Sequence, residues 1–546
     1  MERREFLQTV ALLAAVEPAS AQNTAEPART FPQSVASGDP SSNGIVLWTR
    51  VDPLAQGGNF LNQVAYQIAG APDFGTVLIS GTGTLDLPGK DNTIKVSVSS
   101  RLLQPFTTYY YRFIYNGVLS RTGRFKTLPA ANANLPQLRL GYVVCQDYGN
   151  GYYTALQYLS QEEVDYVVHL GDYIYETITS ATFQNNPART MPPFPSGSTT
   201  IPVDVNDYRH LYKVYRSDPN QQAVHERFGY IQLWDDHEFA NDCHQDFHPD
   251  NNSGSNTAAT PQPNLRQAAN QAWSEYGLAN VAFDPRQDWE HSLRVYRKFS
   301  FGTLADLIVT DERLYRDGPP CGDGQVFQRY FSPGCAALHN PNRTMLGADQ
   351  RQWFLQQITS SQATWKLWAN EVMLMQLKAA GFIYVDLDQW DGYPQERAQI
   401  LSAIGKAGVK NFVALTGDLH TFLAGYLKSD FSDLFETPIG VELMVGSISS
   451  ANLAEDIESA IHLPSAPLPA KNFGVPPNLL EPLVRLNNPH IQYWDSSTHG
   501  YGILDITPAH LACTFKAVTT IRSTTANVVR LRTLTVPAGQ VKLLQS

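Results

Sequence analysis

The chain has 546 residues, of which 43% are hydrophobic and 11% aromatic, while charged residues make up only 17%. So many aromatic side chains exclude a largely disordered chain, and the length allows about three or four domains, or one large domain with an appendage. The formal net charge is -11 and no run of Lys and Arg occurs, so specific nucleic-acid binding is not expected. No stretch reaches the roughly 18 apolar residues of a membrane span, so no transmembrane segment is expected.

The first 21 residues have the pattern of a signal peptide. The basic pair Arg3-Arg4 precedes an apolar stretch, Leu7 to Val16, and the small residues Ala19-Ser20-Ala21 follow. We therefore expect cleavage before Gln22 and a periplasmic or secreted protein. The paired arginines resemble a twin-arginine signal, which would make the twin-arginine export machinery a partner. An ordinary secretory signal with two basic residues is the alternative.

Residues 31–129 are predicted to form a small all-β domain. Short runs of β-branched or aromatic residues are separated by Gly, Pro, Asn and Asp, as strands and their turns would be. The clearest runs are 45–50, 64–68, 94–98 and 108–115. A β-sandwich of about 100 residues fits this spacing.

From Leu138 onward, apolar strand-like runs alternate with helical stretches, which is typical of an α/β fold. We assign residues 138–512 to this catalytic domain and residues 513–546 to a C-terminal tail. Several predicted strands end abruptly in polar, reactive residues, among them Cys145, Asp172, Asp236, Asn370 and Asp418. Ligands of open α/β sheets bind beyond the carboxyl ends of the strands, so these side chains are expected to converge on one site.

The five cysteines predict one disulfide. Cys321 and Cys335 flank a Gly/Pro-rich loop and are the expected pair, as in other exported proteins. An odd number of cysteines leaves at least one unpaired. Cys145 lies at the end of a predicted strand and is interpreted as a ligand rather than as a structural thiol.

The charges at the expected site favour a metal centre. Asp172, Asp236 and Asp418 each follow a predicted buried strand. Three carboxylates brought together without a cation would repel one another strongly in a medium of low dielectric constant. A thiol, a phenol and an imidazole are expected in the same place, and this mixture suits metal ions better than an acid/base pair.

The candidate ligands divide by chemistry into two groups. Cys145 and Tyr175 have reference pKa values of about 8.5 and 10, so binding as thiolate and phenolate requires a strong Lewis acid. Trivalent iron supplies this charge better than zinc or magnesium. The other side is all oxygen and suits calcium, magnesium or manganese; its members are Asp236, Asp418 and Asn370. Asp172 could bridge two such ions, an arrangement that serves displacement at phosphorus.

Other charged residues near these strand ends are interpreted as supports. Asp235 and Glu238 are expected to orient ligands or to begin a helix, and Asp311 and Arg313 to have structural roles. Asp39 and Arg50 are expected to tie the β-domain to the catalytic core.

Ordered segments along the chain resemble a known family. Gly171-Asp172-Tyr173-Ile174-Tyr175 has the spacing of the GDxxY motif of purple acid phosphatases. More closely, the chain resembles the PhoD-like alkaline phosphatase/phosphodiesterase family. The matching segments are Val35–Pro40, Leu47–Arg50, Cys145–Asp147, His169–Glu176, Tyr215–Pro219, Trp234–Glu238, Met345–Gly347, Asp391–Pro394, Leu415–His420 and His499–Tyr501.

The resemblance implies a fold and a site. The fold would be a metallophosphoesterase core, an α/β sandwich of two sheets, preceded by a fibronectin-like β-domain. Ferric iron would be held by Cys145, Asp172, Tyr175 and His420. Calcium, with manganese, magnesium or zinc as substitutes, would be held by Asp172, Asp236, Asp418 and Asn370. His237 corresponds to a catalytic histidine that contacts the scissile ester rather than a metal.

We therefore expect an exported hydrolase of phosphate mono- or diesters, an alkaline phosphatase or phosphodiesterase that serves phosphate acquisition. A phospholipase D-like diesterase and a zinc or manganese hydrolase are alternatives on the same fold. An alternative of another class is a cell-surface binding protein whose esterase domain is inactive. The complete ligand set argues against this last alternative.

Overall fold

The computed structural model describes residues 25–56, 60–180, 184, 187–249, 259–324, 326–455, 482 and 484–546. The predicted signal peptide, residues 1–21, lies outside these ranges. Within them, no helix combines the length and apolarity needed to cross a bilayer.

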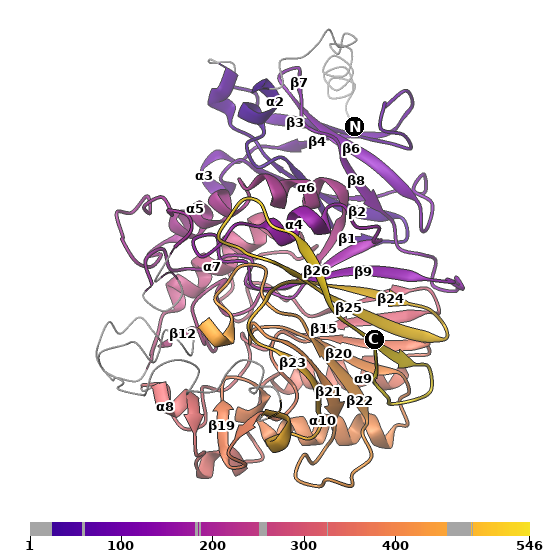
Figure 1. Ribbon diagram of the computed structural model, residues 1–546. Coiled ribbons are helices and arrows are strands. Elements are labelled where there is room, and N and C mark those ends of the chain that lie inside the picture. The colour runs from indigo at the N-terminus through magenta and orange to yellow at the C-terminus, as the bar shows by residue number, and fades with distance from the viewer. Residues whose placement is uncertain are drawn as a thin grey trace.

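Two large β-sheets form the centre of the molecule (Figure 1). The ten-stranded sheet has the order β27 (Leu544–Gln545), β26 (Val528–Pro537), β25 (His510–Val518), β24 (His499–Ile506), β9 (Leu138–Val143), β10 (Tyr166–His169), β11 (Gly229–Gln232), β1 (Val35–Ser41), β2 (Gly44–Arg50) and β5 (Thr93–Ser99). The seven-stranded sheet has the order β14 (Arg297–Phe301), β15 (Ala305–Val309), β17 (Trp365–Ala369), β20 (Phe412–Thr416), β22 (Gly440–Met444), β21 (Phe422–Leu427) and β23 (Ile491–Asp495).

The central strands of both sheets are parallel and buried on both faces. β9, β10 and β11 pair in parallel, and so do β15, β17, β20 and β22. All residues of β15 and β20 are buried. Such strands read as continuous apolar runs because neither face meets water. One apolar core, with residues such as Leu140 of β9 and Leu415 of β20, joins the two sheets.

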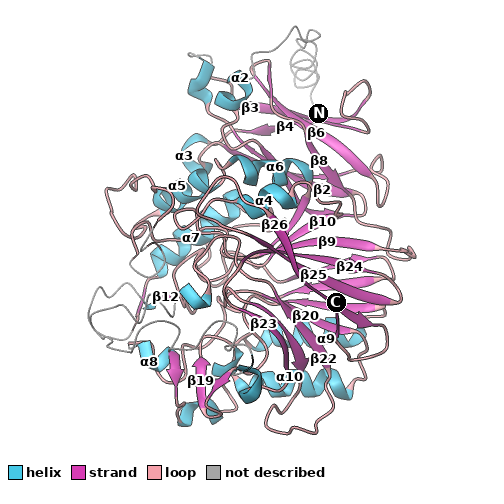
Figure 2. Ribbon diagram, viewed as in Figure 1, coloured by secondary structure: helices cyan, strands magenta, loops and turns pink. Residues whose placement is uncertain are grey.

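Helices cover the outer faces and complete an α/β sandwich (Figure 2). The ten-stranded sheet packs against α4 (Thr154–Leu159), α5 (Val205–Tyr215), α6 (Pro219–Arg227) and α7 (Pro263–Tyr276). The seven-stranded sheet packs against α9 (Ala348–Ser360) and α10 (Pro394–Lys406). The predicted two-sheet fold class is confirmed.

Smaller elements lie around this core. A three-stranded sheet contains β16 (Tyr330–Ser332), β19 (Ile383–Asp386) and β18 (Lys378–Ala379), and β12 (Phe247–His248) pairs with β13 (Thr260–Pro261). Short helices are α2 (Ala25–Thr30), α3 (Leu87–Lys90) and α8 (Val326–Arg329).

The N-terminal all-β region shares a sheet with the core. Its second sheet has the order β4 (Val77–Thr84), β3 (Gln63–Ala69), β6 (Thr108–Tyr115) and β7 (Val118–Leu119), with β8 (Gly123–Lys126) paired to β6. β1 pairs in parallel with β11, which places Ser37 opposite Gly229. Asp39 ties the two regions together as expected, because both its carboxylate oxygens lie 2.8 Å from the Arg297 guanidinium. Arg50 instead pairs with Asp91.

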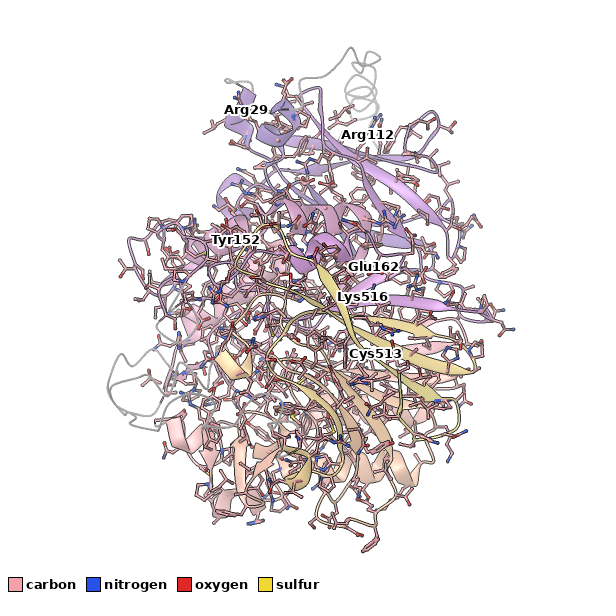
Figure 3. All side chains as sticks on the ribbon, viewed as in Figure 1. Arg29, Arg112, Tyr152, Glu162, Cys513 and Lys516 are labelled. Carbon is pink, nitrogen blue, oxygen red and sulfur yellow. A yellow bond between two sulfur atoms is a disulfide. The ribbon has the colours of Figure 1, made fainter. Side chains whose placement is uncertain are left out.

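The C-terminal residues 513–546, which the sequence assigned to a tail, lie largely in strands of the ten-stranded sheet. β25 pairs with β24 and β26, and β26 with β27. Cys513 and Lys516 are both on β25 (Figure 3), and Lys516 pairs with Glu162, which follows α4. Burial alternates along β25 as its side chains point to opposite faces.

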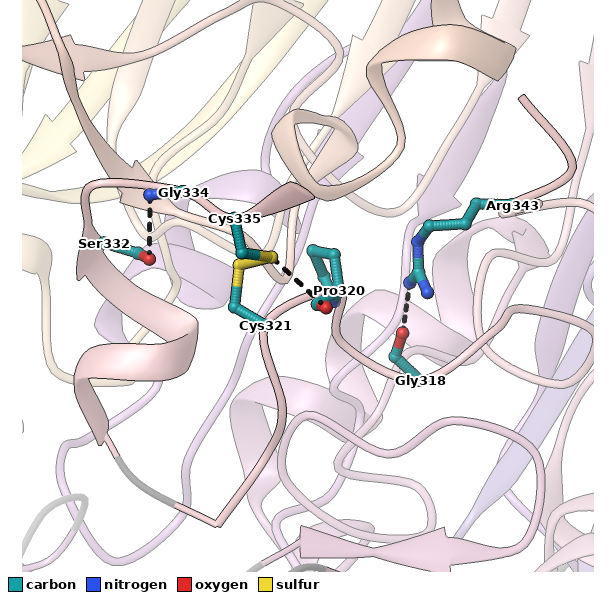
Figure 4. Close-up of a disulfide and its surroundings, with 7 residues drawn as sticks. All are labelled: Gly318, Pro320, Cys321, Ser332, Gly334, Cys335 and Arg343. Atoms are coloured by element: carbon teal, nitrogen blue, oxygen red, sulfur yellow. Dashed lines mark hydrogen bonds between the residues drawn. A yellow bond between two sulfur atoms is a disulfide. The ribbon is translucent and has the colours of Figure 1, made fainter. Parts of the chain in front are cut away.

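The predicted disulfide is present. Cys321 and Cys335 are bonded, with Cα atoms 5.8 Å apart (Figure 4). The two cysteines are 14 positions apart in the sequence, so the bond closes a short loop. Cys145, Cys243 and Cys513 are buried free thiols.

Removing this disulfide should lower the free energy of unfolding. A loop of this length gains about 3 kcal/mol of stability from closure, chiefly through the unfolded chain. We expect the Cys321→Ser/Cys335→Ser variant to lose about that much in urea denaturation, with its catalytic activity retained. Reductant should destabilise the wild type and leave the variant unchanged; an equal effect on both proteins would contradict the assignment.

Candidate metal centre

The predicted site residues follow the carboxyl ends of central strands from both sheets. Cys145 follows β9, Asp172 follows β10, Asp236 follows β11, and Asp418 and His420 follow β20. Ligand atoms of these residues, together with those of Asp235 and His237, form three groups. Within each group all ligand atoms lie within 4.8 Å of one another. These groups are Cys145, Asp172 and His420; Asp172, Asp236 and His237; and Asp235, Asp236 and Asp418. Asp172 and Asp236 each belong to two groups.

The backbone at these positions is strained. Cys145, Asp172, Asp418 and His420 have φ angles of 53°, 55°, 63° and 52°, in the left-handed region that non-glycine residues rarely adopt. Such strain persists where the surrounding structure enforces it, and it clusters at functional sites. Gly171, with φ +106°, lets the backbone before Asp172 lie against the segment after β11, since a Cβ at Gly171 would lie 2.4 Å from Cβ of Asp235.

Nitrogen, oxygen and sulfur donors meet around Tyr175. The Tyr175 hydroxyl lies 3.0 Å from Oδ2 of Asp172 and 3.0 Å from Nε2 of His420. Nδ1 of His420 lies 2.5 Å from the carbonyl oxygen of Ala451. Burial lowers the pKa of His420 to about 4, so the ring is neutral near pH 7. With its proton on Nδ1, the ring directs the lone pair of Nε2 at Tyr175, as in a metal-binding histidine.

The electrostatics of this side fit a cation. Burial raises the pKa of both the Cys145 thiol and the Tyr175 phenol well above their ordinary values, and the Asp172 carboxylate adds to both shifts. Burial and neighbouring carboxylates likewise raise the pKa of Asp172. A cation reverses this balance, since opposite charge favours the ionised forms. A thiolate, a phenolate, an imidazole and a carboxylate suit a strong Lewis acid such as ferric iron.

The oxygen side contains a buried arginine that the sequence analysis treated as structural. Arg313 Nη2 lies 2.5 Å from Asp418 and 3.7 Å from Asp236, and Nη1 lies 2.5 Å from Asp388. Its Nε bonds to Asp235. This guanidinium therefore counters the charge of four carboxylates. Arg313 follows β15, another strand that is followed by charged residues. This position was the feature of the sequence that could have marked Arg313 as part of the site.

His237 lies beside the centre and has an acidic partner. Its Nδ1 lies 2.6 Å from Oε2 of Glu176, and its ring stacks on that of Tyr175 with 4.0 Å between centroids. Burial works to lower the pKa of His237, but the carboxylates of Glu176, Asp236 and Asp172 raise it well above its ordinary value. Glu176 had not been assigned a role, although it ends the His169–Glu176 segment.

Glu238 holds two of the ligand loops together. Its carboxylate accepts backbone N–H bonds from Asp172 at 3.0 Å, Tyr173 at 2.7 Å and Asp235 at 2.7 Å. This contact agrees with the orienting role expected of Glu238. Asp235, its companion in that interpretation, pairs with Arg313.

Asn370 makes its hydrogen bonds in the core after β17. Its Nδ2 donates to the carbonyl of Val372 at 2.8 Å, and its Oδ1 accepts from the Trp390 indole at 3.2 Å. Neither of these partners is one of the proposed calcium ligands. The role of Asn370 as a calcium ligand therefore stays a prediction from the resemblance.

Comparison with known proteins gives concordant matches. Residues 140–515 match the PhoD-like phosphatase family, and residues 16–129 match the PhoD-like phosphatase N-terminal domain. Alkaline phosphatase D of Bacillus subtilis (strain 168) is 35% identical over 435 residues, which cover 78% of this chain and 70% of the relative. A solved structure of PhoD is similar with a TM-score of 0.79 and 28% identity, covering 97% of this chain and 93% of that one.

Proposed function

Since the chain belongs to the PhoD-like phosphatase family and is a phosphoester hydrolase, we propose that it cleaves phosphate mono- or diesters at a ferric iron–calcium centre. The observation that carries this proposal is the convergence of a thiol, a phenol, an imidazole and several carboxylates after the central strands of both sheets. No acid/base pair needs this mixture of donors.

The donor chemistry divides the proposed ligands as follows. Iron would be held by Cys145, Asp172, Tyr175 and His420, and calcium by Asp172, Asp236, Asp418 and Asn370. Manganese, magnesium or zinc are the substitutes. Bound cations of this kind would act as Lewis acids that stabilise charge developing on the phosphoryl oxygens.

The residues of the chain would orient the ester and move a proton. We assign to His237 the donation of a proton to the leaving alcohol oxygen, because its ring is fixed beside Asp172 and Asp236. The Glu176 carboxylate, 2.6 Å from Nδ1, would keep the ring oriented and protonated. Arg313 would hold Asp418 and Asp235 in place and limit the repulsion between them.

The proposal includes export and a role in phosphate acquisition. The signal-like residues 1–21 support export, with Arg3-Arg4 favouring the twin-arginine route. The Cys321–Cys335 disulfide suits an oxidising compartment. A phosphoesterase outside the cytoplasm would release phosphate from esters that the cell does not take up intact.

Tyr175→Phe tests the iron assignment. A phenolate bound to ferric iron gives a visible charge-transfer band, so the wild type purified after export should be coloured and contain iron. We expect Tyr175→Phe to remove or shift this band. The measurement is the visible spectrum together with elemental analysis of the same sample.

Tyr173→Phe is the matched control. Tyr173 lies two residues away, but its ring stacks on those of Tyr212 and His225 in the core. This variant should keep the band of the wild type. An iron-containing wild type without a visible band when oxidised would reject the phenolate ligand.

A further inference from the structure

A buried turn, residues 447–452, follows β22 and lies behind the proposed iron site. The six residues from Ser447 to Asn452 are all buried, each at most 8% exposed. The sequence analysis assigned them no role. Their contacts reach three of the proposed iron ligands, which come from different strand ends.

The first of these contacts is with the Cys145 loop. The backbone N–H of Ile448 donates to the carbonyl oxygen of Cys145 at 3.0 Å, and those of Ser449 and Ser450 lie 3.4 Å from the same oxygen. The Ser449 hydroxyl donates to the carbonyl of Asp147 at 2.7 Å. The 447–452 turn therefore holds the strained backbone that carries the Cys145 thiol.

The other two contacts are with Tyr175 and His420. A side-chain hydrogen bond joins Ser450 to Tyr175. The carbonyl of Ala451 lies 2.5 Å from Nδ1 of His420. This carbonyl fixes the tautomer that leaves Nε2 to act as a ligand.

His499 joins the two ends of the turn. Its Nδ1 lies 3.0 Å from Oγ of Ser447, and its Nε2 lies 3.1 Å from Nδ2 of Asn452. The Ser447 hydroxyl donates to the carbonyl of Ser450 at 2.7 Å, so it accepts from Nδ1–H of His499. Oε2 of Glu455 lies 3.3 Å from Nε2 of the same ring.

The neighbouring glycine adds a backbone link between the same elements. The N–H of Gly500 donates to the carbonyl of Ser447 at 2.9 Å. A Cβ at Gly500 would lie 1.9 Å from the carbonyl oxygen of Lys516 on β25. Glycine at this position therefore lets β24 lie close to β25, and the bond from Gly500 to Ser447 places the neighbouring His499 against the turn.

We infer that His499 is a positioning residue for the iron side of the centre, acting through the 447–452 turn on Cys145, Tyr175 and His420. The inference rests on the proposed function, because these three residues are the proposed iron ligands. It assigns a role to the His499–Tyr501 segment that neither the ligand set nor the catalytic histidine explains. The oxygen side, held by Arg313 and Glu238, has no bond to this turn among the contacts described.

The test is the affinity of the full-length holoprotein for each ion. Iron retention is measured by competition with a ferric chelator, and calcium retention by titration with a calcium chelator. Loss of a partner behind a metal ligand lowers metal affinity by about 10- to 100-fold. For His499→Ala we expect about tenfold weaker iron binding and a shifted charge-transfer band, with calcium affinity within about twofold of the wild type.

Two further variants sharpen the result. Ser447→Ala removes the acceptor of the Nδ1 bond with a smaller change of volume, and should cause the same selective loss of iron. It also keeps the test decisive if His499→Ala does not fold. His499→Asn places an amide N–H near the position of Nδ1, so it should recover most of the iron affinity.

His510→Ala is the matched control. His510 lies at the opposite end of the β24–β25 hairpin and bonds to Thr507 within its own turn. It should leave both affinities unchanged. Unchanged iron affinity in His499→Ala and Ser447→Ala, or equal weakening of iron and calcium, would overturn the inference. A wild type that binds no iron would instead reject the proposed centre, and this inference with it.

Discussion

Asp172→Ala is expected to remove both metal ions and to lower kcat/KM by about 10³-fold or more. Asp172 is common to the group with Cys145 and His420 and to the group with Asp236 and His237. Stabilisation of charge by bound metals contributes several kcal/mol to a transition state, and each 1.36 kcal/mol corresponds to a factor of ten in rate. Loss of one shared ligand should therefore cost more than loss of a ligand to either ion alone.

The measurements are kcat/KM and the iron and calcium content of the purified variant. Asp207→Asn is the control, because Asp207 is equally buried but bonds to Ser196 and Val203, away from all three groups. It should keep both ions. An Asp172→Ala protein that retained iron and calcium at wild-type levels would contradict the shared position.

His237→Ala is expected to cost far more with poor leaving groups than with good ones. A proton donor matters most when the leaving alcohol is a strong base, and general acid catalysis contributes about 10²–10⁴-fold. We expect a loss in that range for an alkyl phosphate ester and a loss below about tenfold for the matched nitrophenyl ester. The metal content should stay near that of the wild type.

Glu176→Gln provides a graded comparison for the same role. Its amide would keep a hydrogen bond to Nδ1 of His237 and remove the charge that raises the pKa of the ring. We therefore expect a smaller loss with the same preference for good leaving groups. If the His237→Ala variant lost the same fraction of wild-type activity with both esters, the acid role of His237 would be rejected. Loss of metal in that variant would make His237 a ligand, since it lies in one group with Asp172 and Asp236.

The local pattern was sufficient for the α/β character of the core and for several of the residues that the structure brings together, whereas the two-sheet sandwich was expected from the family resemblance. A buried parallel strand is a continuous apolar run, so a sudden change to polar residues marks its carboxyl end. Cys145, Asp172, Asp236 and Asp418 were found in this way, because each lies within four residues of the end of such a strand. The disulfide was also local, since its cysteines are 14 residues apart.

Contacts between distant parts of the chain were decided by the tertiary structure. The Arg313–Asp418 pair joins residues 105 positions apart, and the bond from His499 to Ser447 joins residues 52 apart. Nothing in the residues around Arg313 shows that four carboxylates surround it. Similarly, β1 lies beside β11, and β24 to β27 extend the catalytic sheet, because strand order depends on pairing between remote segments. Sequence periodicity records which face of an element is buried, whereas the partner that covers it is set only when the whole chain packs.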